Sequence, residues 1–99
     1  MSDLDDLANK IYTLHKEAVK QSLAFCKPEV ESIIENNVQD IKTIEQMLDT
    51  LLGVAYDDDI LILYKNLCRH YYYINKENTA YYVNSYREMW DNEEETENE

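Results

Sequence analysis

The chain has 99 residues and a formal net charge of −12, from 21 acidic residues and nine Lys and Arg residues. It holds one glycine and one proline, which excludes Gly-rich phosphate loops and argues against an all-β fold, because tight turns draw on both residues. The net acidity also argues against direct binding of nucleic acid through phosphates, which calls for clustered lysine and arginine.

The first predicted element is a helix over residues 3–26. Its apolar residues recur at spacings of three, four and seven, and we expect this stripe to face the rest of the domain. The stripe consists of Leu4, Leu7, Ile11, Leu14, Ala18 and Phe25. Pro28 is expected to end the helix, because a proline disfavours helical geometry at the residue before it.

The second predicted helix spans residues 28–52, with Pro28 in its first turn, where a missing N–H costs nothing. Its apolar seam is made of Val30, Ile34, Ile41, Ile44, Leu48 and Leu51. Asn37 interrupts this seam, either as a polar residue at the edge of a bundle or as one that fixes register. Gly53 is expected to end the helix in the left-handed conformation.

The third and fourth predicted helices span residues 58–74 and 76–91. Asp57, Asp58 and Asp59 point about 100° apart on a helix, so they suit an N-cap and the helix dipole better than a metal ion. The third helix is apolar over most of its circumference, which marks it as central, and Asn75 is expected to cap the fourth.

Short connections predict an all-α, four-helix bundle-like domain over residues 1–90. The first two helices would form a long antiparallel hairpin against which the shorter third and fourth helices pack. The ends of that hairpin would stay uncovered, which favours a homodimer over a monomer. Residues 91–99 contain six acids and no apolar residue, and they are predicted to be a disordered acidic tail.

Residues able to do chemistry are scarce. His15 and His70 fall on different predicted helices. Cys68 and His70 fall on the same predicted helix, but their side chains point in different directions. We therefore expect no catalytic, cofactor or metal site. The N-terminus is acidic and no apolar run reaches membrane length, which predicts a cytoplasmic protein without membrane contact. Cys26 and Cys68 would then be reduced, buried hydrophobes, although a disulfide between them stays open.

Aromatic residues are concentrated in the second half, where nine of the 11 lie between residues 56 and 90. Tyr71, Tyr72 and Tyr73 cover about 200° of a helix, so they cannot all face one core. They form either a protein interface, in which Tyr and Arg are enriched, or a half-buried rim of the core. Stacking on the bases of single-stranded nucleic acid is a third interpretation, and the negative net charge of the chain argues against it. The predicted partner-binding residues are Lys65, Arg69, His70, Tyr72, Tyr73, Tyr81 and Arg87.

These observations predict a small non-catalytic protein–protein interaction module, an adaptor or regulator. The alternative rests on four acids that lie away from the seam of the second predicted helix: Glu31, Glu35, Glu45 and Asp49. They are either an ordinary solvated face or the surface of a DNA-mimicking inhibitor of a nucleic-acid-binding protein, of the phage or mobile-element type.

Overall fold

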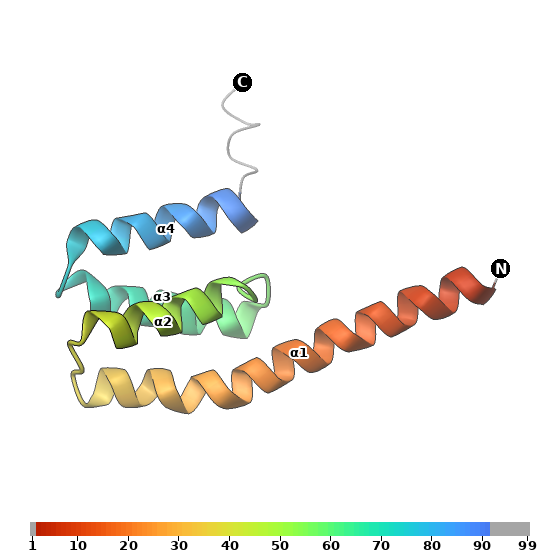
Figure 1. Ribbon diagram of the computed structural model, residues 1–99, viewed down its shortest axis with the longest axis horizontal. Coiled ribbons are helices and arrows are strands. Elements are labelled where there is room, and N and C mark those ends of the chain that lie inside the picture. Colours follow the sequence, from red (N-terminus) through yellow and green to blue (C-terminus); the bar gives the residue numbers. More distant parts are fainter. Residues whose placement is uncertain (1, 92–99) are drawn as a thin grey trace, which may run out of the picture.

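A computed structural model describes residues 2–91. This part of the chain is all-α, as predicted, with four helices and no strand: α1 (Ser2–Glu35), α2 (Ile41–Leu52), α3 (Asp58–Tyr72) and α4 (Lys76–Trp90) (Figure 1). None of these helices is both long and apolar enough to cross a membrane. Of the predicted tail over residues 91–99, all but Asp91 lies outside the described residues.

Helix α1 continues through Pro28 without a break, so the predicted boundary between residues 26 and 28 is wrong. The proline lacks the N–H that would bond the carbonyl of Ala24, but both residues are exposed, and water can satisfy that carbonyl. Continuing the helix keeps Cys26, Val30 and Ile33 on one buried face. Packing of that face outweighs the local preference of the proline.

The second correction concerns Asn37, which lies in the α1–α2 loop and not in a helical seam. Its φ is 51°, and the backbone N–H groups of Asn37 and Val38 donate to the carbonyls of Ile34 (3.1 Å) and Ile33 (2.9 Å). This is a Schellman ending, in which asparagine is one of the few residues that tolerate the left-handed conformation. Helix α2 then begins after Asp40, whose side chain accepts a hydrogen bond from the Thr43 N–H.

The sequence predicted the chemistry of three other helix ends, and two of these predictions are confirmed. Asp57 accepts from the Ile60 N–H and Asn75 accepts from the Asn78 N–H, which confirms both predicted caps. Gly53 differs from the prediction: its φ of −65° and ψ of −20° are right-handed helical values. The glycine is therefore not required by the backbone at that position.

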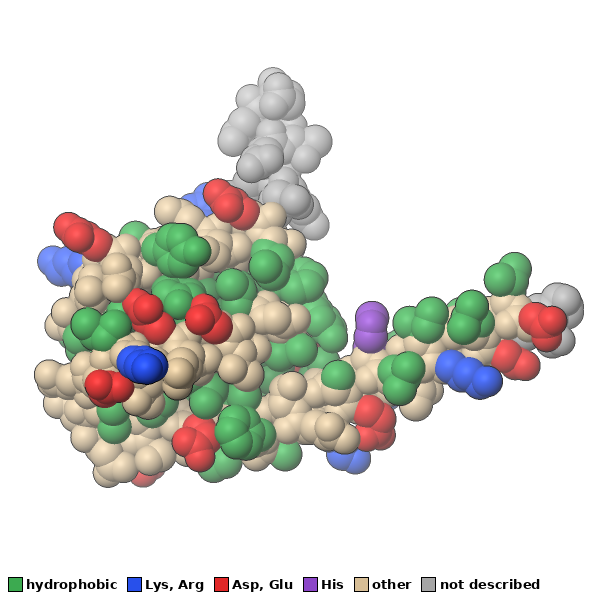
Figure 2. All heavy atoms as spheres, viewed as in Figure 1, with side chains coloured by type: hydrophobic (Ala, Val, Ile, Leu, Met, Phe, Trp, Pro, Cys, Tyr) green, Lys and Arg blue, Asp and Glu red, His purple; other side chains and the backbone are tan. Residues whose placement is uncertain are grey.

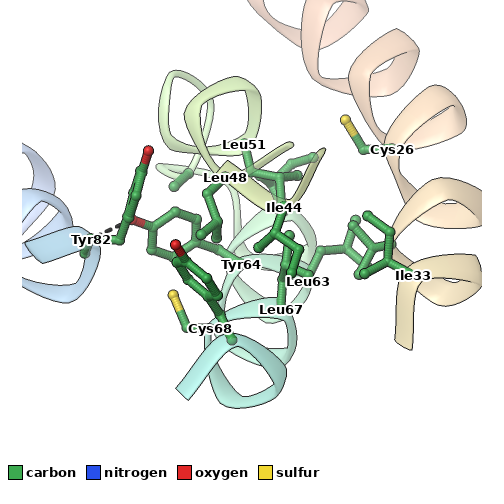
Figure 3. Packing of buried hydrophobic residues seen from close by; sticks show 14 residues of the cluster. Cys26, Ile33, Ile44, Leu48, Leu51, Leu63, Tyr64, Leu67, Cys68 and Tyr82 are labelled. Carbon is green, nitrogen blue, oxygen red and sulfur yellow. Dashed lines mark hydrogen bonds between the residues drawn. The ribbon is translucent and has the colours of Figure 1, made fainter. Parts of the chain in front are cut away.

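Helix α3 is central, as predicted, and it contacts each of the other three helices. Helices α2 and α3 lie between α1 and α4 (Figure 1). Figure 3 shows side chains from all four helices meeting around α3. The largest fully buried side chains are Tyr71, Ile44, Leu48, Leu51, Ile60, Leu67, Val30 and Cys26.

The predicted stripe of α1 does not pack against the bundle, which corrects the expectation that it faces the domain. Its members Leu4, Leu14 and Phe25 are 76%, 66% and 61% exposed. The face that does pack begins at Val19 and lies about 100° round the helix. The N-terminal half of α1 therefore projects from the bundle as an arm (Figures 1 and 2). We call the exposed residues Leu4, Leu7, Ile11, Leu14, Ala18 and Phe25 the α1 stripe.

Candidate functional site

An open groove with a largely apolar lining lies between α3 and α4. Its volume is about 340 Å³. Residues from both helices line it: Leu61, Tyr64, Lys65, Cys68, Arg69, Tyr72, Tyr73, Thr79, Val83 and Tyr86. We call it the α3–α4 groove.

The floor of the groove is held by a buried hydrogen bond between the two helices. The Tyr64 hydroxyl donates to the main-chain carbonyl of Tyr82 at 2.7 Å (Figure 3). Burial raises the pKa of Tyr64 far above its usual value, so the hydroxyl keeps its proton and remains a donor. This bond fixes the spacing of α3 and α4, and therefore the shape of the floor.

Aromatic rings and cations form the rim on the α3 side. The rings of Tyr72 and Tyr73 meet edge to face, with centroids 5.5 Å apart. The ammonium of Lys76 lies 5.4 Å from the centroid of the Tyr72 ring. Lys65 and Arg69 are exposed beside them, and Arg69 donates to the side chain of Asn66 at 3.2 Å. The rim thus offers cationic and aromatic groups beside an apolar floor.

Four of the seven predicted partner-binding residues line the α3–α4 groove: Lys65, Arg69, Tyr72 and Tyr73. The other three lie elsewhere. His70 is half-buried, and its Nε2–H donates to the Val38 carbonyl at 2.8 Å, which ties α3 to the α1–α2 loop. Tyr81 is 66% exposed on α4, and Arg87 is exposed near the end of the same helix.

The tyrosines divide between inside and outside, as the 200° argument requires. Tyr71 is fully buried, whereas Tyr73 is 82% exposed. On α4, Tyr82 is buried and Tyr81 is exposed. The aromatic cluster therefore contributes some rings to the buried core and leaves others on the surface.

The buried tyrosines reach carboxylates of α2. The Tyr71 hydroxyl donates to Glu45 Oε2 at 2.5 Å, and Asn78 Nδ2 donates to the same oxygen at 2.8 Å. The Tyr82 hydroxyl donates to Asp49 Oδ1 at 2.8 Å. Burial, followed by these carboxylates, raises the pKa of both tyrosines, because a nearby negative charge opposes loss of the phenolic proton.

The four acids of the alternative surface do not share one helix, because α1 ends at Glu35 and α2 begins at Ile41. Glu31 and Glu35 are exposed on α1, while Glu45 and Asp49 lie on α2. The two acids on α2 each accept a hydrogen bond from a buried tyrosine, so they join α2 to α3 and α4.

Both cysteines are free and buried, as expected for small hydrophobes. Cys68 lies in the groove floor, where burial raises the pKa of its thiol to about 11. Such a thiol stays protonated and unreactive at neutral pH. Within residues 2–91, no three His, Cys, Asp or Glu side chains are grouped so that they could hold a metal ion.

The groove floor was not singled out from the sequence as part of a site. Leu61, Tyr64, Cys68 and Val83 line the groove but are not among the predicted partner-binding residues. The sequence held one signal for the groove, which is that α3 is apolar around most of its circumference. Helices α1 and α2 cover only part of that circumference, and the remaining face is shared with α4. Helix α4 covers that face only in part, which leaves the groove open.

Comparison of the chain with protein-family models, curated proteins and solved structures gave no match in any of the three.

Proposed function

We propose that this protein is a small non-catalytic interaction module, an adaptor or regulator, that binds a partner protein through the α3–α4 groove. The observation that carries the proposal is an open apolar groove of about 340 Å³ with tyrosines and cations on its rim. A volume of this order accommodates one or two large side chains of a partner.

Large apolar side chains that line the groove are exposed. Tyr73 and Tyr72 are 82% and 45% exposed, and Val83 is 41% exposed. Tyrosine and arginine are enriched at the residues that dominate protein–protein affinity. A partner side chain in the groove would be ringed by contacts that exclude water.

The charges on the groove residues indicate which kind of partner segment would bind. Lys65 and Arg69 line the groove, and no carboxylate is among its lining residues, although the chain as a whole carries a net charge of −12. The rim is therefore a local cationic exception on an acidic protein. The complementary partner is a protein segment with an apolar anchor residue flanked by aspartate or glutamate.

Selection of peptides from a random displayed library on the full-length protein tests this chemistry. We expect enriched peptides to carry an aromatic or aliphatic anchor with neighbouring acids. Fluorescence anisotropy of a selected peptide should then show at least about tenfold weaker binding to Arg69→Glu and to Tyr73→Ala. Enrichment of basic peptides, or unchanged binding to both variants, would contradict the proposal.

Two matched controls separate the groove from general effects of charge and aromatic surface. Lys42→Glu reverses an exposed cation on α2, and Tyr12→Ala removes a tyrosine that is 63% exposed on the arm of α1. Neither residue lines the groove. Both variants should bind the selected peptide as the wild type does.

The DNA-mimicking inhibitor remains the alternative, and the geometry supports it less. Glu45 and Asp49 are engaged by buried tyrosines, and the four acids are split between two helices. Competition by duplex DNA for a captured partner, together with steep weakening by salt, would favour this alternative over the groove.

A further inference from the structure

The arm of α1 carries a long row of uncovered apolar side chains. Within the α1 stripe, Leu4, Leu7, Ile11 and Leu14 are 76%, 54%, 47% and 66% exposed. These side chains lie on one side of the helix, as their spacing requires, and Figure 2 shows apolar groups following the arm outward from the bundle.

Apart from a contact between the rings of His15 and Tyr56, whose centroids lie 6.2 Å apart, the arm lacks the packing that usually stabilises a helix. Every residue from 3 to 18 is exposed, and the first half-buried residue of α1 is Val19. A helix of about 16 residues is marginal in water by itself, because most helical stability in proteins comes from packing of an apolar face. A partner along the α1 stripe would supply that packing.

The spacing of the α1 stripe points to another helix as that partner. Leu4, Ile11 and Ala18 recur every seven residues, and Leu7 and Leu14 recur at the same interval between them. This is the first-and-fourth pattern of a coiled-coil heptad, in which side chains of one helix fit between those of another. The face of α1 that packs against the bundle lies about 100° away around the helix, so the α1 stripe and the packed face can contact different neighbours.

The charges beside the stripe select the partner and its direction. Lys10 and Glu17 occupy equivalent flanking positions, one heptad apart. In one antiparallel register of two identical helices, Ile11 of each chain lies opposite Leu14 of the other chain. In that register, Lys10 of each chain faces Glu17 of the other chain. A shift of one heptad in either direction brings Lys10 to Lys10 or Glu17 to Glu17.

A parallel pair is disfavoured by the tip of the arm. Residues 3–9 hold three aspartates and no cation, whereas residues 10–20 hold three lysines and one glutamate. Parallel pairing would bring six aspartates together, while antiparallel pairing sets each acidic tip near the basic stretch of the other chain.

We infer that a second copy of this chain covers the α1 stripe, in an antiparallel helix pair that sets Lys10 of each copy opposite Glu17 of the other. The area of apolar surface that the two arms can bury sets the affinity of this dimer. With roughly 100 Å² of apolar surface per fully exposed Leu or Ile, the four residues offer about 250 Å² per chain. The corresponding interface, on the order of 800 Å² in total, is that of a weak and reversible dimer.

Sedimentation equilibrium across micromolar to millimolar concentrations tests the dimer. The wild type should associate, and Leu14→Glu should be monomeric, since it places a charge on the stripe without disturbing the core. Thr13→Glu is the matched control, because Thr13 is exposed on the opposite side of α1. It should dimerise like the wild type. A wild-type monomer throughout, or equal loss in both variants, would overturn the inference.

A charge swap tests the direction and register. Lys10→Glu and Glu17→Lys should each weaken the dimer about fivefold or more, since each creates two like-charge pairs in the symmetric complex. The double variant should regain the wild-type dissociation constant. Failure of the double variant to recover would overturn the antiparallel register, and binding of the monomer to lipid vesicles through the α1 stripe would assign that surface to a membrane.

Discussion

Removal of one hydroxyl, in Tyr71→Phe, tests the network that joins α2 to α3 and α4. The Tyr71 side chain is fully buried, and its hydroxyl donates to Glu45 at 2.5 Å. A hydrogen bond to a charged acceptor contributes about 1.5–3 kcal/mol, so we expect a loss of about 2 kcal/mol. Glu45 keeps its bond from Asn78, which limits the loss. In a domain of this size that loss lowers the melting temperature by about 8–16 °C.

Urea unfolding followed by circular dichroism measures this effect, with two reference variants. Tyr82→Phe removes a bond to Asp49, which is exposed and can be rehydrated, so about 1 kcal/mol is expected. Tyr72→Phe changes a side chain that is 45% exposed and should stay within about 0.5 kcal/mol of wild type. If Tyr82→Phe cost more than Tyr71→Phe, the assignment of Glu45 as the central acceptor would be refuted.

The same network sets the response to alkali. The pKa of Tyr71 is raised in the folded chain, chiefly by burial, above its unfolded value of about 10. The folded state therefore holds this proton more tightly, so the contribution to stability is complete below about pH 10 and is lost as the pH rises beyond it. The fall of the urea midpoint above pH 10 should be shallower in Tyr71→Phe than in the wild type.

Three further predictions concern the backbone and the buried thiol. Asn37→Gly should be at least about 1 kcal/mol more stable than Asn37→Ala, because residue 37 has a φ of 51°; equal stabilities would contradict the left-handed ending of α1. Gly53→Ala should raise the free energy of unfolding by about 0.4–1 kcal/mol, since an added Cβ comes no closer than 3.7 Å to the Thr50 carbonyl oxygen and the backbone is already helical. With a pKa of about 11, Cys68 should react with iodoacetamide at pH 8 at least about a hundredfold more slowly than a free thiol until urea unfolds the chain.

The sequence predicted most accurately the structural features that depend on residues close together in the chain. The caps at Asp57 and Asn75 were identified because a side-chain oxygen and the N–H groups it accepts from lie in one turn. The prediction of four helices also agrees with the structure, although the boundary between the first two was placed at Pro28 and not after Glu35. The division of the tyrosines into buried and exposed sets was foreseen from helix geometry, though not which ring would lie inside.

The sequence was misread where tertiary packing decides. Pro28 suggested a helix boundary, but residues on both its sides share the buried face that begins at Val19 and includes Cys26 and Val30. That face is visible as a run of spacings of four and three across the proline. The more regular α1 stripe drew attention away from it, because periodicity shows that a face is apolar without showing what covers it.

The α3–α4 groove and the α1 stripe are independent surfaces, since α2 and α3 lie between α1 and α4 (Figure 1). An antiparallel pair of arms would leave one groove open on each of two bundles. A partner with two acidic, apolar-anchored segments on a flexible linker would then bind with a gain from effective concentration. Leu14→Glu should remove that gain in a titration with a tandem peptide, while leaving the affinity for the single peptide unchanged. Loss of both affinities would show that the arm shapes the groove itself.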